Sequence, residues 1–537
     1  MKNILAKILM PAALILSAVL YAAGGPPAAA APKNEAQFDK LVKTYTLNPD
    51  GSQELRVQKQ LTIYTHAAMN SLYGETFIVY DPAYQQLKIN ESYTRQVDGT
   101  IVTTPANAFV EVLPSAAANA PAYNGLKEMV VVHTGLELGA TIYLDYTVTT
   151  KAGALPALDI FEQVEELSPI KEYVLSVTVP SGTPLHYALL NGSTKPSVSE
   201  ANGARTVKWT LRNVRPRPRY LAVSAPAGNV QAVAVTTFDS QQAVADVIKS
   251  QLYSPEDEAV KALLASLNEG PADRRSTVDK IHEYLSTGLA QNRLSLAQTG
   301  YKVRPAADVI HSAYATDAER TLLAAALLQA AGQESEVTLA FPRTSDPAAA
   351  GLASLQNTMA AGLVDRADEA TADIAGYLSI IGLDGQPAEV AAPDHKADVE
   401  STLSVSASEA ASVAEGIYSF TLPEARSGWL GSVYASTTSN TTRPVNLLLP
   451  YLADETYTCT LDVQDGLKAV ALPENMTLDT PVGSLRVIVA EVDGKTVITR
   501  SLKLVQQLIT PALYPQYYRL MSEWYTLCAT PLIFSAE

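Results

Sequence analysis

The chain changes its hydrophobic periodicity twice, and this change constrains the fold more than any other feature of the sequence. Apolar and polar residues alternate from Ile142 to Val148 and from Tyr173 to Val179. A period of two directs one row of side chains inward and the next outward, which is typical of half-buried strands. Between residues 43 and 64, the turn Asn48-Pro49-Asp50-Gly51 predicts a β-hairpin. We therefore expect a β-sandwich over residues 41–235.

Helical spacing replaces this alternation after about residue 240. Apolar residues three and four positions apart mark one helix face at Val278, Ile281, Leu285 and Leu289. A second helix stops at Gly332, and a T-x-x-E capping box formed by Thr316 and Glu319 marks its start. Because residues 336–341 then have the pattern of a strand, we expect an α+β domain over residues 236–395.

Strand patterns return in the last part of the chain. The alternating residues there are Tyr457, Cys459, Leu461 and Val463. The turn Asp493-Gly494-Lys495 joins two further alternating segments. We expect a small C-terminal β-sandwich over residues 396–537, and we interpret parts of the Ala-, Ser- and Asp-rich stretch 345–420 as loop. The predicted fold class is α+β and multidomain, with a β-sandwich at each end of a central α+β domain.

The N-terminal segment is typical of a signal peptide. Lys2 and Lys7 precede an apolar run from Ile8 to Leu20, and small residues follow. The run is short for a membrane span, and no later segment has ~18 uninterrupted apolar residues. We expect a signal peptide over residues 1–23, a linker over 24–40 and no further transmembrane segment. Because no cysteine follows the apolar run, we expect a periplasmic or cell-surface protein without a lipid anchor.

Charge and cysteine content narrow the possible partners. Lys and Arg number 39 against 55 Asp and Glu, a formal charge of -16. Nucleic acid and anionic lipid both attract clustered Lys and Arg, so neither is an expected partner. The two cysteines, Cys459 and Cys528, either form a disulfide or are two small buried side chains.

The order of these parts resembles that of a known bacterial family. The segments that carry the resemblance are residues 73–114, 128–148, KIHEYL (280–285), YKVRPAADVI (301–310), RTLLAAALLQAAG (320–332), 442–451 and 483–504. Together they resemble secreted proteins in which the domain of unknown function 3857 precedes a transglutaminase-like domain and a small C-terminal β-domain closes the chain. The resemblance implies a papain-like α+β fold for the middle domain.

The resemblance also implies a cysteine mechanism whose residues this chain lacks. In such domains a thiolate at a helix start attacks an amide carbonyl, a His on a later strand is its base, and an Asp on the next strand orients the His. The corresponding positions here are Asp317, Asn357 and Ser379. No cysteine lies between residues 24 and 458, so the middle domain cannot contain a thiol nucleophile. It resembles a pseudoenzyme, with no catalytic residue retained.

Each residue that could support a different chemistry also has a simpler structural explanation. Asp317 could act as an oxygen nucleophile, but the helix dipole and the adjacent capping box already account for an acid there. The histidines lack metal-ligand spacing such as His-x-x-x-His, so we expect no metal and no cofactor. The acidic cluster Glu162, Glu165 and Glu166 fits a solvated edge better than a Ca²⁺ site.

These observations predict a non-catalytic envelope protein that binds or scaffolds a peptide, a glycan or a partner protein. Two alternatives stay open: a hydrolase of cell-wall peptide or glycan that uses residues other than cysteine, and a structural assembly protein. Clustered Asp, Glu and His in one cleft would favour the first, and a large exposed apolar patch would favour the second. Whether Asp317, Asn357 and Ser379 surround an open pocket or a filled core is the most informative observation.

Overall fold

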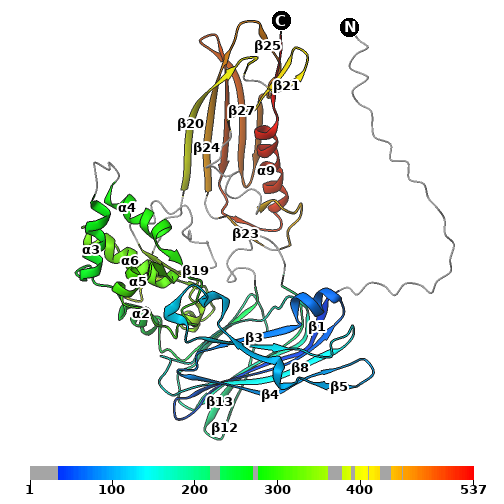
Figure 1. The fold of residues 1–537 in the computed structure, drawn as a ribbon, viewed down its shortest axis with the longest axis vertical. Coiled ribbons are helices and arrows are strands. Elements are labelled where there is room, and N and C mark those ends of the chain that lie inside the picture. Colours follow the sequence, from blue (N-terminus) through cyan, green and yellow to red (C-terminus); the bar gives the residue numbers. More distant parts are fainter. Residues whose placement is uncertain are drawn as a thin grey trace, which may run out of the picture. The chain divides into compact units, whose positions relative to one another are not determined.

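The structure is a computed structural model of the chain (Figure 1). It describes residues 34–217, 230–269, 276–360, 378–388, 394–408, 411–423, 437–444, 446–449 and 452–536. The predicted signal peptide and most of the predicted linker lie outside the described residues. Strand β1 begins at Ala36, so the first domain starts earlier than the predicted boundary at residue 41. Within the described ranges, no helix is both long and apolar enough to cross a membrane.

The first domain is built on a sheet of eight strands in the order β12-β13-β10-β1-β2-β8-β4-β5. Its strands are β1 Ala36–Leu47, β2 Gln53–Ile63, β4 Gln85–Arg95, β5 Ile101–Thr103, β8 Thr141–Thr150, β10 Ile170–Pro180, β12 Ser197–Ala201 and β13 Ala204–Val214. The predicted hairpin is present, because β1 and β2 pair antiparallel on either side of the turn. Gly51 in this turn has a φ of 84°, a conformation that glycine adopts without strain.

Two three-stranded sheets cover the inner face of the large sheet. One contains β9 Asp159–Gln163, β11 His186–Leu190 and β14 Ala232–Thr236, and the other β3 Glu75–Tyr80, β6 Phe109–Val112 and β7 Lys127–Val132. Trp209 and Tyr173 of the large sheet share a core with Val233 and Val235 of β14. Burial of these facing apolar rows holds the layers together, as the period of two in the sequence predicts.

The middle domain packs helices against a three-stranded sheet of order β18-β17-β19. Its elements are α2 Gln241–Lys249, α3 Glu258–Asn268, α4 Thr277–Glu283, α5 Ala306–Ser312, α6 Asp317–Ala330, β17 Val337–Pro342, β18 Asn357–Ala360 and β19 Leu378–Gly382. Leu323 and Leu327 of α6 are buried in one core with Leu339 and Phe341 of β17. Helix α6 ends just before Gly332, as expected.

The C-terminal domain has two sheets, of orders β20-β24-β28-β27-β26 and β21-β22-β30-β25, and one long helix. The elements are β20 Asp394–Val405, β21 Ala411–Ala414, β22 Ile417–Phe420, β24 Leu452–Val463, β25 Leu467–Ala471, β26 Met476–Thr480, β27 Gly483–Val492, β28 Lys495–Leu504, α9 Tyr514–Ala529 and β30 Leu532–Ala536. Helix α9 contains several tyrosines and was not part of the predicted C-terminal β-sandwich. Its Tyr514, Tyr517 and Trp524 are buried.

Among its described residues, the stretch 345–420 contains strands β18 to β22 with irregular segments between them, so parts of it are loop as expected. Strand β20 pairs in parallel with β24 and crosses the predicted boundary between residues 395 and 396. Cys459 and Cys528 do not form a disulfide; Cys459 is only 1% exposed, as the buried-thiol alternative expects, whereas Cys528 is half-buried. The chain as described is mostly β-sheet and multidomain.

Candidate functional site

Helix α6 begins where the resemblance places a nucleophile. Thr316 is its N-cap: Glu319 N donates to Thr316 Oγ1 at 3.3 Å, and Thr316 N donates to Glu319 Oε2 at 2.8 Å. The predicted capping box is confirmed. Asp317 is the first residue of the helix and is exposed, and its Oδ1 accepts a hydrogen bond from Gln291 Nε2 at 2.8 Å. The positive end of the helix dipole stabilises a carboxylate at this position.

A pocket of about 280 Å³ lies beside this helix start. Its walls are the loop 293–297, the first turn of α6 and the segment 352–358 that leads into β18. Two hydrogen bonds join β18 to the helix: Thr358 Oγ1 donates to Thr321 Oγ1, and Thr321 Oγ1 donates to the Thr358 carbonyl, each at 3.0 Å. The region of Asp317 is therefore an open pocket and not a filled core.

The other two positions assigned by resemblance lie on the strands that flank β17. Asn357 pairs with Ala340, and Ser379 pairs with Phe341. Thr358 is the residue of the first segment that contacts α6 and lines the pocket. Ser379 is half-buried and is not among the described residues that line it. The pocket thus combines the helix start with Thr358 and leaves Ser379 outside.

The polar side chains that line this pocket are the guanidinium of Arg293 and several side chains that carry oxygen atoms. No histidine is among the described residues that line it. Both thiols lie in the C-terminal domain, where burial raises the pKa of Cys459 and Cys528 Sγ accepts a hydrogen bond from Arg500 Nη1 at 3.3 Å. A buried thiol with a raised pKa forms little thiolate, so Cys459 does not have the character of a nucleophile.

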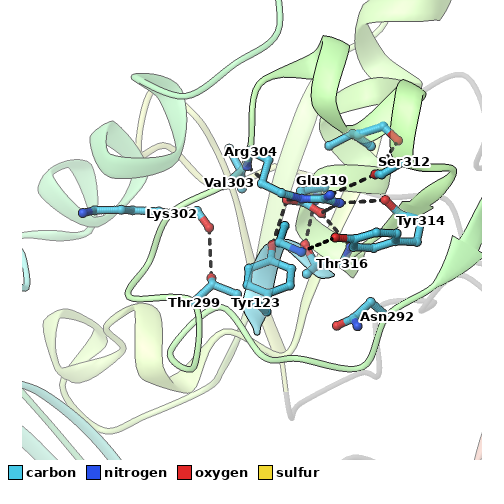
Figure 2. A network of polar contacts seen from close by, with 12 residues as sticks. Tyr123, Asn292, Thr299, Lys302, Val303, Arg304, Ser312, Tyr314, Thr316 and Glu319 are labelled. Atoms are coloured by element: carbon cyan, nitrogen blue, oxygen red, sulfur yellow. Dashed lines mark hydrogen bonds and ion pairs between the residues drawn. The ribbon is translucent and has the colours of Figure 1, made fainter. Parts of the chain in front are cut away.

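A buried ion pair between Arg304 and Glu319 holds the first turn of α6 (Figure 2). Arg304 Nε and Nη2 donate to Glu319 Oε1 and Oε2 at 2.9 and 3.0 Å, and the side chains are 11% and 0% exposed. The same guanidinium donates to Ser312 Oγ at 2.9 Å and to the Tyr314 carbonyl at 2.7 Å. Its carbon also lies 4.2 Å from the centre of the Tyr314 ring. Nearly every donor of Arg304 is thus used, as a buried cation requires.

Tyr123, a residue of the first domain, also takes part in this network. Its hydroxyl donates to Glu319 Oε1 at 3.0 Å, and Arg304 lies 5.5 Å from its ring centre. Burial raises the pKa of Glu319, but hydrogen bonds from Arg304 and from the Thr316 amide outweigh it and hold that pKa below its ordinary value. Burial, followed by the Glu319 charge, raises the pKa of Tyr123. Glu319 is therefore an ionised carboxylate paired with the Arg304 guanidinium, and the Tyr123 hydroxyl beside them is neutral.

Two further hydrogen bonds join the first domain to the pocket wall at Ala353 and to Asn292, which precedes the lining loop. Ala353 N donates to Asp159 Oδ2 at 2.9 Å, and Asn292 Nδ2 donates to the Ala116 carbonyl at 2.9 Å. Burial raises the pKa of Asp159 to about 7. The carboxyl is packed so closely that a Cβ on Gly351 would lie 2.0 Å from Asp159 Oδ1. No local sequence pattern indicates these contacts, because each joins residues far apart in the chain.

The remaining histidines and acids form no group of three or more potential metal ligands among the described residues. His66, His282 and His311 are exposed, and His186 Nδ1 lies 3.1 Å from Asp346 Oδ2. Glu162 is not at a solvated edge as expected, because it accepts hydrogen bonds from Lys43 Nζ and Tyr45 OH between the layers of the first domain. The interpretation of this cluster was therefore wrong for Glu162.

Comparisons with known proteins find similar sequences or structures for most of the chain. Residues 49–218 match DUF3857, a domain of unknown function with a solved structure, and residues 426–534 match DUF3858, also of unknown function. The crystal structure of a candidate protease from Parabacteroides distasonis shares 36% identity over 93% of this chain and 99% of that chain, with a TM-score of 0.81. An M1 zinc metallopeptidase from Deinococcus radiodurans shares 14% identity over 37% of this chain and 41% of that chain, and its TM-score is only 0.18. No curated protein matches significantly.

Proposed function

The chain belongs to the same family as the Parabacteroides distasonis protein, with DUF3857 and DUF3858 regions, and on this premise we propose that it is a non-catalytic, periplasmic or cell-surface protein that binds peptide. Its middle domain is then a degenerate transglutaminase-like domain. The binding site is the 280 Å³ pocket at the start of α6.

One observation carries this proposal. The pocket is open at the position of the missing nucleophile, yet the residue there, Asp317, has no base beside it among the described lining residues and bonds to an amide. Acyl transfer from an amide needs an activated nucleophile and a base within hydrogen-bond reach of it. A pocket without these groups can still bind the peptide that an active relative of this fold would transform.

The lining favours a peptide as ligand. Arg293 and Asp317 are exposed at the pocket and carry one charge of each sign, and Ser295, Gln356 and Thr358 add donors and acceptors. A peptide offers both N–H donors and carbonyl or carboxylate acceptors, so it satisfies a pocket with both kinds of partner. The envelope location follows from the signal peptide pattern in the sequence.

Fluorescence polarisation with labelled peptides tests the proposal. The probe is a fluorescein-labelled pentapeptide library that includes the D-amino-acid stem peptides of the cell wall. We expect Asp317→Asn and Arg293→Gln each to weaken binding at least tenfold, whereas Asp465→Asn, an exposed residue in the C-terminal domain, should leave it unchanged. The absence of peptide binding, or equal binding by all three variants, would contradict a peptide site here.

A second candidate is hydrolysis, because the Parabacteroides relative is named a candidate protease. Asp317 would then have to act on the substrate itself, as nucleophile or as base for water. Loss of a measurable cleavage activity in the folded Asp317→Asn protein would favour this candidate.

A further inference from the structure

The outer face of the eight-stranded sheet is a second surface with distinctive chemistry. The inner face is packed against the two smaller sheets. Strand pairing places alternate residues on the other face, and many of these carry hydroxyl groups, among them Thr44, Thr62, Thr141, Thr147, Ser176 and Thr210. This face is independent of the pocket in the middle domain.

The face is hollowed and not flat. A groove of about 510 Å³ crosses β4, β8, β2, β1, β10 and β13. Six strands span roughly 24 Å at the usual strand spacing, so the groove has room for an extended ligand across the strands. Asp145, one of its lining residues, is only 8% exposed. A simple solvated sheet face would leave such a carboxylate in water.

The charges on this groove are balanced. Its outward charges come from Lys40, Lys208, Arg212, Glu91, Asp145 and Glu172. Lys59 also borders the groove, but its Nζ donates to Thr76 on the inner side of the sheet. With equal numbers of cations and anions, the groove does not match the uniform negative charge of nucleic acid or of an anionic membrane.

Protein docking also fits this groove poorly. The described lining contains no Trp, Phe or Met, and Val174 and Leu144 are 8% and 2% exposed. Protein interfaces draw most of their affinity from exposed aromatic, Met and Arg anchors that become buried on binding. The only aromatic residue in this lining is Tyr143, and it is already stacked on Tyr93 with ring centres 4.6 Å apart.

The polar groups are held in place before any ligand binds. Arg56 Nε and Nη2 donate to Asp145 at 3.0 and 2.6 Å, and Gln58 and Asn90 each donate to the same carboxylate at 2.9 Å. By contrast, Glu172 lies 3.4 Å from Lys40 and 3.6 Å from Arg212. These longer ion pairs leave N–H donors available at one end of the groove, and the fixed carboxylate and amides lie towards the other.

We propose that this groove binds an oligosaccharide chain laid across the strands. A sugar chain presents many hydroxyl groups, each of which both donates and accepts a hydrogen bond. The groove supplies matching partners: the carboxylates of Glu91 and Glu172 as acceptors, ammonium and guanidinium groups as donors, and the Gln60 amide and Thr210 hydroxyl as both. The first domain therefore attaches the protein to a polysaccharide, and this activity does not depend on peptide binding by the middle domain.

Affinity electrophoresis of the mature full chain in native gels tests the proposal. The gels contain one soluble polysaccharide each: laminarin, xylan, polygalacturonate, or glycan strands prepared from peptidoglycan. We expect at least one of them to retard the protein. The double variant Gln60→Ala/Lys208→Ala, altered at two solvent-accessible groove positions, should raise the dissociation constant at least tenfold.

Two control variants separate this site from charge effects and from the peptide site. Lys468→Ala removes an exposed lysine in the C-terminal domain, and Asp317→Asn alters the peptide pocket; neither should change the retardation. Lack of retardation by all four polysaccharides, or retardation that the double variant retains in full, would overturn the proposal. Retardation lost in Asp317→Asn would also overturn it, because the glycan would then occupy the middle domain.

Discussion

The ion pair between Arg304 and Glu319 gives the sharpest energetic prediction. Glu319→Gln keeps the shape of the side chain but removes its charge, and it turns one acceptor atom into an N–H donor that faces the guanidinium. The carboxylate is 0% exposed and receives hydrogen bonds from Arg304, Tyr123 and the Thr316 amide. Removing one partner of a buried ion pair costs about 3–5 kcal/mol, and we expect a loss of about 3 kcal/mol because the amide retains one acceptor.

Tyr123→Phe measures the contribution of the first domain to the same network. It removes one hydrogen bond to a charged group, at a cost of about 1.5–3 kcal/mol. In the double variant with Glu319→Gln, the loss of stability should be smaller than the sum of the two single losses. Tyr123 and Arg304 both donate to Glu319 Oε1, so the two substitutions disturb the same hydrogen bonds. The expected coupling is about 1 kcal/mol or more.

Native-state hydrogen exchange is the suitable assay, because it reports the local opening free energy of α6 within a multidomain chain. The pKa of Glu319 is depressed, so its stabilisation is present above the ordinary glutamate pKa and is lost as the pH falls through the depressed value. Protection of α6 should therefore decrease on acidification in the native protein and not in Glu319→Gln. Protection in Glu319→Gln within about 1 kcal/mol of the native protein would refute the reasoning, given the cost of breaking a buried pair.

Three further predictions concern single residues. Asp317→Ala should lower stability by about 0.5 kcal/mol through the lost helix-dipole interaction, as measured by urea denaturation, and an unchanged stability would contradict that interaction. Burial raises the pKa of Asp159 to about 7, so its protonated form stabilises the native state fully below the ordinary pKa, and this contribution is lost as the pH rises through about 7. Melting temperatures between pH 5 and 8 should show that loss in the native protein and not in Asp159→Asn; an identical pH profile would contradict it. Neither alkylation of the thiols nor Cys459→Ser should change the turnover of amide substrates. A turnover that either treatment removes would place a catalytic site in the C-terminal domain.

Local patterns in the sequence were sufficient to predict the local elements. Alternating residues around Val177 and Leu461 lie on strands β10 and β24, and the T-x-x-E pattern at Thr316 forms the capping box. Helix α9 was missed although its signal was present: Tyr514, Tyr517 and Trp524 recur at helical spacing and share one buried face. Periodicity, and not composition, is the property that indicates this helix.

The site itself could be predicted only in part, because most of it depends on contacts between distant residues. The absence of a thiol in the middle domain was plain from the sequence. That Thr358 faces α6 required the register of β17 and β18. The contacts of Tyr123 with Glu319 and of Asp159 with Ala353 join residues almost 200 positions apart, and such pairings are set by tertiary packing.

Product analysis can show whether the middle domain binds peptide without transforming it. The mature protein is incubated with the pentapeptide library, and the products of hydrolysis and of amide exchange are quantified by mass spectrometry alongside fluorescence polarisation of the same peptides. The account predicts saturable binding that Asp317→Asn weakens, with every peptide recovered intact. Catalytic turnover of a bound peptide that is lost in a folded Asp317→Asn protein would contradict the account and establish an enzyme with an oxygen nucleophile or base.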